Sequence, residues 1–174
     1  GGYIICTVCI EHDGEITEQR KLGLAVVEAV KQGENLMYAS LDGADLRGTD
    51  LAGVCLFEAD LAFANFRGAD LEGTCLRGAD LAFADFQGAD LDGAIFRGAD
   101  LRGADFRDAD LVGTDFTCSD LEGALFLYAD SRFADFRGAD LRGTRGIKKG
   151  ANWTKTATLN TGLKGIGLYQ NQID

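Results

Sequence analysis

Five cysteines and a single histidine are the residues of this chain best suited to bind a metal ion or to act as nucleophiles. Cys6 and Cys9 have the Cys-x-x-Cys spacing of many zinc sites, but residues three apart in an extended segment point to opposite faces. His12 supplies the only imidazole. We therefore expect structural thiols, no metal site and no cofactor.

The remaining cysteines do not indicate catalysis either. Cys55 and Cys75 would have Cα atoms within disulfide range if their segments stack, but a reducing cytoplasm favours free thiols. Cys118 falls at a position expected to face outward. His12 has no convincing nucleophile partner, and no phosphate-binding glycine loop is present. We predict that the protein is not an enzyme.

These side chains must be positioned by a repeat that fills most of the chain. A leucine or phenylalanine recurs at every fifth residue from Leu36 to Leu141, and only Ser131 interrupts the series. A period of five fits neither a helix nor a long strand, so each pentad must hold a short extended piece and a bend. A small residue stands two places before nearly every large one, so both share the inward face. Glycine usually stands two places after it, as in a turn that needs positive φ.

The segment GADLRGADFRDADLVGTDF shows this five-residue pattern over several consecutive pentads. It is similar to the A-(D/N)-L-X-X consensus of the pentapeptide-repeat family, and residues 36–145 follow it without insertion. The resemblance implies an all-β solenoid, a right-handed quadrilateral β-helix with four pentads per coil and the large residue inside. The resemblance also implies that the regularly spaced aspartates have a structural role and do not form a row of metal-binding sites.

Residues 1–35 are expected to form an N-terminal strand and a capping helix. Tyr3–Ile10 is rich in β-branched residues, and Thr17 can cap a helix over about 18–32 that ends at Gly33. One side of this helix is apolar: Leu22, Val26, Ala29 and Val30. We expect it to cover the open N-terminal end of the core, because an uncovered coil end invites aggregation.

Residues 146–174 do not follow the five-residue repeat. We expect them to form an irregular tail that is either a cap or a dimer contact. The last coil and the tail carry apolar residues that are candidates for this role: Leu125, Leu127, Tyr128, Phe133 and Trp153. Because the two ends of the rod differ, they permit a closed homodimer through the C-terminal end.

The net charge of −11 resides in the repeat, since residues 36–145 carry 21 acidic residues and 10 arginines. Such an acidic rod repels nucleic acid, so direct binding to DNA or RNA is not expected. No apolar run approaches the ~20 residues that span a bilayer, and no signal-like segment is visible. We expect a soluble cytoplasmic protein without membrane contact.

With four pentads per coil, residues twenty apart should stack about 4.8 Å apart on one wall. One such column is acidic throughout: Asp50, Asp70, Asp90, Asp110 and Asp130. Arginines one place after the large residue are expected to neutralise such columns: Arg67, Arg97, Arg102, Arg107, Arg137 and Arg142. Either the aspartates bond to the backbone and solubilise the surface, or they imitate the phosphates of DNA.

Apolar residues at outward positions form further candidate contacts. Phe63 and Phe83 are twenty apart and should stack, while Phe57 and Ile95 belong to a second strip with Cys55 and Cys75. The N-terminal strand, the tail or a partner could cover them. At the polar Ser131 position we expect Phe133 or a tail residue to fill the missing volume.

Two functions remain. The first is a non-catalytic scaffold or protein-interaction module with a protein partner. The second, implied by resemblance to the topoisomerase-regulating branch of the family, is a DNA mimic that binds a DNA-binding enzyme such as DNA gyrase. The rod is about 26 Å long at ~4.8 Å per coil, less than one turn of duplex, which favours the first.

Overall fold

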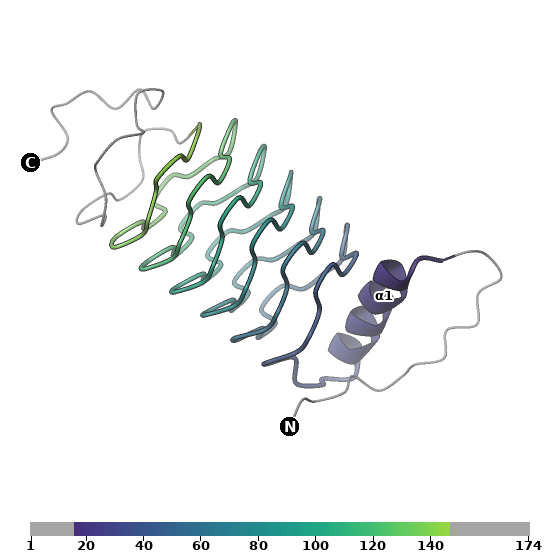
Figure 1. Cartoon of the computed structure of the whole chain (residues 1–174). Helices are drawn as coiled ribbons and strands as arrows, with labels where there is room; N and C mark the ends of the chain where they lie inside the picture. The colour runs from purple at the N-terminus through teal and green to yellow at the C-terminus, as the bar shows by residue number, and fades with distance from the viewer. Residues whose placement is uncertain (1–15, 147–174) are drawn as a thin grey trace, which may run out of the picture.

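The computed structural model describes residues 16–146, and the chain forms a stack of similar coils with one helix across its first end (Figure 1). The strand expected at Tyr3–Ile10 and the tail after Gly146 lie outside the described residues. The strand–helix cap as a whole and the tail therefore stay predictions.

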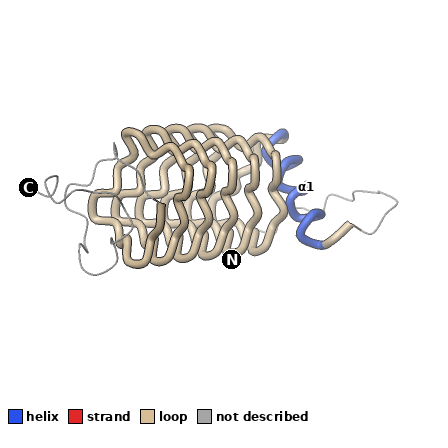
Figure 2. Tube along the Cα trace, turned by 90° about the horizontal axis from the view of Figure 1, so that it is seen from above, coloured by secondary structure: helices blue, strands red, loops and turns tan. Residues whose placement is uncertain are grey.

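Each coil takes twenty residues, because parallel bridges join residues twenty apart, such as Asp60 to Asp80 and Asp80 to Asp100. Each bridge consists of backbone hydrogen bonds, with each of the two coils donating an amide to a carbonyl of the other. The Leu61 amide donates to the Asp80 carbonyl at 2.7 Å, and the Asp80 amide donates to the Ala59 carbonyl at 3.0 Å. Each contact between coils is an isolated bridge and not an extended strand, so the described β-structure is drawn as loop (Figure 2).

The corners between the walls need a left-handed residue two places after each large one. Glycine fills most of these positions, as Gly68 and Gly88 do with φ of 62° and 66°. Eight described residues other than glycine occupy the same position, also at positive φ: Tyr38, Glu58, Phe63, Phe83, Asp108, Cys118, Tyr128 and Phe133. Left-handed backbone costs a residue with a Cβ about 1–2 kcal/mol, so each of these corners is strained relative to a glycine corner.

The interior is a continuous column of the repeated leucines and phenylalanines. Phenylalanines twenty apart stack with parallel rings, as Phe86 and Phe106 do at a centroid distance of 4.9 Å. Phe96 and Phe116 form a second stack at 5.2 Å and meet the first edge-on, with Phe96 and Phe106 6.0 Å apart. The rings of opposite walls thus interdigitate, which fixes the spacing of the coils from inside.

Helix α1 spans Glu18–Lys31 and lies across the first coil (Figure 1). Thr17 is its N-cap, with the side-chain oxygen accepting from the Arg20 amide at 3.2 Å. Val26 and Ala29 are buried with the first leucines of the repeat. The Gln19 carbonyl accepts from the Asp45 amide at 2.9 Å, so the helix backbone supplies a bond that a preceding coil would otherwise make.

The expected compensation by Phe133 for the polar Ser131 is wrong. Phe133 is 75% exposed with φ of 62°, because it occupies the outward corner position and not an inward one. Ser131 itself is buried, and its hydroxyl has no hydrogen-bond partner among residues 16–146. Within the described part of the chain, the core of the last coil therefore carries a polar group without a hydrogen bond.

Ser131→Ala is expected to leave the free energy of unfolding unchanged or to raise it by up to about 1 kcal/mol, because the lost hydroxyl makes no hydrogen bond to any residue that the structure describes. Ser119→Ala is the matched control. Its buried hydroxyl donates to the Phe116 carbonyl at 2.7 Å, so its loss should cost about 1 kcal/mol. Urea denaturation measures both, and equal losses in the two variants would show that the Ser131 hydroxyl is satisfied in solution.

Candidate interaction surface

The rod has four walls, each built from pentads that stand twenty residues apart, and each wall is identified by its first complete pentad. Wall 1 contains Leu41 and every twentieth residue after it, wall 2 contains Leu46, wall 3 contains Leu51, and wall 4 contains Leu56. Walls 1 and 3 are therefore opposite, as are walls 2 and 4. Within each pentad the residue before the large one and the residue after it both face outward.

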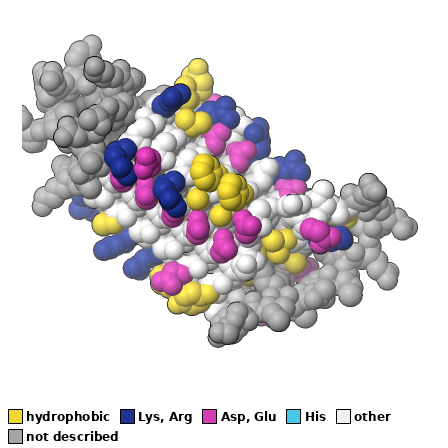
Figure 3. Space-filling view, viewed as in Figure 1, with side chains coloured by type: hydrophobic (Ala, Val, Ile, Leu, Met, Phe, Trp, Pro, Cys, Tyr) yellow, Lys and Arg dark blue, Asp and Glu magenta, His cyan; other side chains and the backbone are white. Residues whose placement is uncertain are grey.

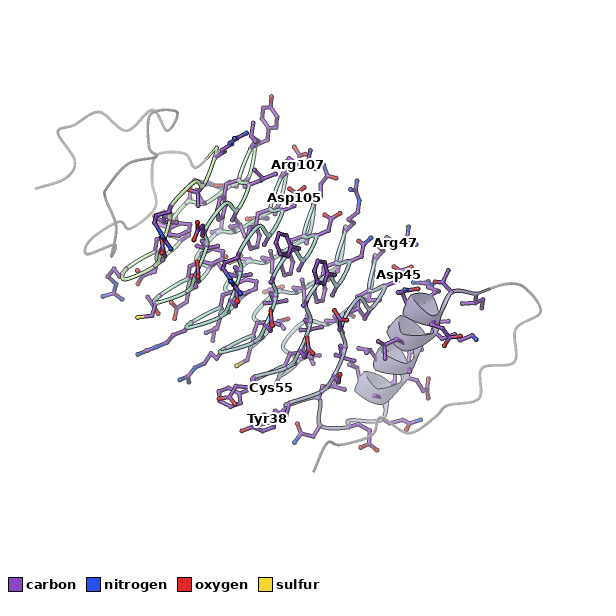
Figure 4. All side chains as sticks on the ribbon, viewed as in Figure 1. Tyr38, Asp45, Arg47, Cys55, Asp105 and Arg107 are labelled. Atoms are coloured by element: carbon purple, nitrogen blue, oxygen red, sulfur yellow. The ribbon has the colours of Figure 1, made fainter. Side chains whose placement is uncertain are left out.

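Aspartate–arginine pairs bridge these two outward positions. The Asp45 carboxylate accepts from the Arg47 Nη2 at 2.7 Å, and the Asp105 carboxylate accepts from the Arg107 Nε at 2.9 Å. Both pairs lie along one side of the stack (Figure 4). Arg102, Arg132, Arg137 and Arg142 make the equivalent pair with the aspartate two places before them. The aspartate also caps the corner, as Asp105 does by accepting from the Arg107 amide at 3.0 Å.

These contacts favour the ionised carboxylates. The side-chain hydrogen bond from Arg47 lowers the pKa of Asp45 against the smaller opposing effect of burial. Burial alone would raise the pKa of Asp105, but the side-chain and backbone bonds from Arg107 together outweigh it and lower that pKa. The pKa values of Asp100 and Asp135 are lowered in the same way by Arg102 and Arg137.

The Asp105–Arg107 pair is expected to make stability depend on pH. Because the pKa of Asp105 is lower in the folded state, its contribution is fully present above the unfolded value of about 3.9 and is lost as pH falls through the folded value. The stability difference between the wild type and Arg107→Gln should thus be constant above about pH 5 and shrink at lower pH. Urea denaturation at each pH measures it. A difference that grows on acidification would contradict the pairing.

The net charge is confined to two opposite walls. Wall 3 carries seven acidic residues and one arginine, a net charge of −6, and wall 1 carries seven acidic residues and two arginines, a net charge of −5. Walls 2 and 4 are neutral, with four and three charges of each sign. Four aspartates of the predicted wall 3 column make no ion pair with another described residue: Asp50, Asp70, Asp90 and Asp110. Asp130, the fifth, pairs with Arg132.

The expected neutralisation by arginine holds for most of the named residues but is wrong for Arg97. Arg67 reaches Asp85 of the next coil at 3.3 Å, because its own pentad has Asn65 in place of aspartate. Arg77 and Arg97 make no ion pair with any residue between 16 and 146. Their pentads carry Cys75 and Ile95 where the aspartate normally stands.

Wall 1 also carries an exposed aromatic pair. The rings of Phe63 and Phe83 stack 5.3 Å apart at an interplanar angle of 11°, with side chains 62% and 58% exposed. The Phe83 ring covers Gly103, where an added Cβ would lie 2.7 Å from the ring. Hydrophobic and acidic side chains lie side by side in the middle of the face shown in Figure 3.

The second predicted strip lies on wall 4, as expected from its spacing. Cys55 is exposed, and Phe57, Cys75 and Ile95 are half-buried. The Phe57 ring meets Tyr38 edge-on at 5.6 Å, so this strip has a local neighbour that sequence reasoning missed. Tyr38 could have been found from its position, since it stands two places after Leu36 where glycine is usual.

The candidate contacts of the last coil do not form one cluster. Leu125, Leu127 and Tyr128 lie on wall 2, whereas Phe133 follows at the corner of wall 3. Tyr128 is 73% exposed, and no ring contact joins it to Phe133 within the described part of the chain. Trp153 lies outside the described residues. From residue 16 to residue 146 no helix has the length and apolar character to cross a membrane.

Comparisons with solved structures give the same kind of protein repeatedly. A pentapeptide repeat protein of the Arabidopsis thaliana thylakoid lumen is 36% identical, covering 58% of this chain and 70% of its own, with a TM-score of 0.39. HetL of Nostoc sp. strain PCC 7120, involved in heterocyst differentiation regulation, is 26% identical over 81% of this chain and 77% of its own, with a TM-score of 0.35. QnrB1, a plasmid-mediated fluoroquinolone resistance protein, is 20% identical over 80% and 84%, with a TM-score of 0.30.

No curated protein matches the chain in sequence. The family model for pentapeptide repeats matches in eight copies, over residues 35–73, 47–81, 79–117 and 114–145. These matches cover the whole coil stack, and known structures of such proteins are right-handed quadrilateral β-helices. The chain belongs to the pentapeptide repeat family.

Proposed function

We propose that this chain is a non-catalytic protein-binding module, and that it contacts its partner through wall 1 at Phe63 and Phe83. The observation that carries the proposal is the placement of two exposed phenylalanines at corners where glycine is the unstrained choice. Bulky residues at positive φ are rare, and such strain persists where the surrounding structure imposes it, often at binding sites. Membership of a family of structural and interaction modules supports the same reading.

The surroundings of the aromatic pair indicate what the partner presents. Asp60 and Asp80 stand three places before the two phenylalanines, and neither makes an ion pair with another described residue. Ala62 and Ala82 have small side chains, so no bulky group stands between the carboxylates and the rings. An arginine suits this site, because its guanidinium can bind a carboxylate with two hydrogen bonds and stack on an aromatic face. The partner is therefore a protein whose contact surface carries arginine beside apolar side chains.

A displayed library of random peptides tests the proposal without knowledge of the partner. The library is selected on the wild type and counter-selected on the Phe63→Gly, Phe83→Gly double variant. We expect enriched peptides to contain arginine, and to lose binding to the double variant and to Asp60→Asn, Asp80→Asn. Peptides that bind the wild type and the double variant equally, or no enrichment at all, would overturn the proposal.

Phe133→Gly is the matched control, since Phe133 is also an exposed phenylalanine at positive φ, 62°, but on another wall. It should leave peptide binding unchanged. Folding should not confuse the result, because glycine relieves about 1–2 kcal/mol of backbone strain while the lost ring stacking costs about 0.5–1.5 kcal/mol. The free energy of unfolding of Phe63→Gly is thus expected within about 1 kcal/mol of the wild type.

DNA mimicry is the second candidate, and the charge distribution favours it. The net −11 of the coils lies on opposite walls 1 and 3, and over about 26 Å it amounts to one charge per about 2.4 Å, against ~1.7 Å for duplex DNA. Gyrase supercoiling assays with the purified protein separate the two functions. Inhibition that Asp70→Asn, Asp90→Asn, Asp110→Asn abolishes and Phe63→Gly, Phe83→Gly leaves intact would support mimicry over the contact proposed above.

A further inference from the structure

Wall 4 departs from the charge pattern of the rod in two neighbouring coils. In six other pentads an outward aspartate pairs with the arginine two places later. In the pentads of Arg77 and Arg97, the aspartate position holds Cys75 and Ile95. By equivalence of position, the Arg77 guanidinium can reach across Leu76 to the thiol of Cys75, as Arg47 reaches across Leu46 to the Asp45 carboxylate.

A second thiol, that of Cys55, lies next to Cys75 in the preceding coil. Cys55 and Cys75 are joined by a parallel bridge, with the Leu56 amide donating to the Cys75 carbonyl at 2.8 Å and the Cys75 amide donating to the Val54 carbonyl at 2.9 Å. Both cysteines are free, Cys55 exposed and Cys75 half-buried. The ladder spacing of ~4.8 Å lies within the Cα separation of 4.4–6.8 Å that disulfides require.

The two arginines give the middle coils of wall 4 a local excess of positive charge, although the wall as a whole is neutral. Arg77 and Arg97 are exposed, stand in successive coils of one column, and make no ion pair with another described residue. The acidic residues of the flanking coils on this wall are Glu58, whose side chain lies over Gly78, and Asp115, which is bridged to Ile95. Figure 4 shows Cys55 on the opposite side of the stack from the labelled Asp45–Arg47 pair. Unpaired guanidinium groups bind carboxylates with paired hydrogen bonds, so a small anion is attracted here and repelled from walls 1 and 3.

We propose that Cys55, Cys75, Arg77 and Arg97 form a modification site for an anionic low-molecular-weight disulfide of the glutathione disulfide class. Arg77 and Arg97 bind its carboxylates and bring the disulfide to Cys75. This site is on a different wall from the protein-binding surface and does not depend on it.

The reaction is a pair of thiol–disulfide exchanges. The Cys75 thiol releases its proton to solvent, and the thiolate attacks one sulfur of the disulfide, whose S–S bond breaks as the Cys75–glutathione bond forms. The departing glutathione thiolate takes up a proton. The Cys55 thiolate then attacks the Cys75 sulfur and expels the second glutathione in the same way. Two protein thiols are oxidised to one disulfide, and one molecule of glutathione disulfide is reduced to two thiols.

The experiment compares two disulfide probes of opposite charge on the full-length protein. Glutathione disulfide is anionic and cystamine is cationic, and the modification of each cysteine is followed by proteolytic mass mapping. With glutathione disulfide we expect Cys75 to react faster than the exposed Cys118. The wild type should proceed to the Cys55–Cys75 disulfide, and Cys55→Ser should stop at the mixed disulfide on Cys75.

The arginine variants give the decisive comparison. Arg77→Gln, Arg97→Gln should slow modification of Cys75 by glutathione disulfide about tenfold at low ionic strength, and should not slow cystamine. Arg137→Gln, which removes a wall 4 arginine already paired with Asp135, is the control and should change neither rate at Cys75. Equal glutathione disulfide rates in the wild type and the double variant would overturn the inference, as would slowing of both probes alike or preferential reaction at Cys118.

Discussion

Replacing Phe106 by alanine is expected to lower the free energy of unfolding by about 4–5 kcal/mol, at the upper end of the range for buried phenylalanine. The side chain is fully buried, and its ring stacks between Phe86 at 4.9 Å and Phe126 at 5.0 Å. It also meets Phe96 and Phe116 edge-on at 6.0 Å and 5.5 Å. The change therefore opens a cavity and removes four ring contacts, each of which contributes beyond buried area.

Phe66→Ala separates the ring contacts from burial alone. Phe66 is equally buried on the same wall, but among the described residues its ring has a single aromatic neighbour, Phe86 at 4.9 Å. We expect a loss of about 3 kcal/mol, and urea denaturation with comparison of midpoint and slope measures both variants. Because a solenoid holds together through contacts between neighbouring coils, the Phe106 variant should also show the broader transition. Equal losses would mean that the crossed stacks add nothing to burial.

Much of the fold could be predicted from the sequence because a single period determines which way each residue faces. A period of five with twenty residues per coil places Asp60 over Asp80 and Phe63 over Phe83, as the structure shows. The helix bounds were also accessible, since Thr17 and Gly33 flank α1 on either side of Glu18–Lys31. The helix bounds depend on local chemistry alone, whereas the coil of twenty residues was implied by the resemblance to the pentapeptide-repeat family.

The errors arose where a residue was judged by its type and not by its position. Phe133 was expected to turn inward because it is large, but it stands two places after Ser131, where the corner directs every side chain outward. Arg97 was expected to be neutralised because arginines elsewhere are, but Ile95 removes its acceptor. The docking of α1 through Gln19 and Gly23 could not be predicted, because it depends on how closely two backbones approach.

That close approach makes Gly23→Ala the most informative change at the N-terminal end. A Cβ at Gly23 would lie 1.8 Å from the carbonyl oxygen and 2.8 Å from the carbonyl carbon of Asp45. Both are backbone atoms of a coil held on its far side by further bonds, so α1 must move. The helix then loses the bond from the Asp45 amide to the Gln19 carbonyl and part of the burial of Val26 and Ala29.

The expected cost is about 3 kcal/mol, from overpacking of about 1–3 kcal/mol and a lost bond of about 0.5–1.5 kcal/mol. Helix propensity acts in the opposite direction, because alanine stabilises a free helix by about 1 kcal/mol relative to glycine. Lys31→Ala, at an exposed position of α1, is the control and should stay within about 0.5 kcal/mol of the wild type. Urea denaturation gives the loss, and hydrogen exchange should show the Asp45 amide losing protection while amides of later coils such as Asp80 keep theirs. A Gly23→Ala protein of wild-type stability, with the Asp45 amide still protected, would show that α1 does not dock on the first coil through this contact.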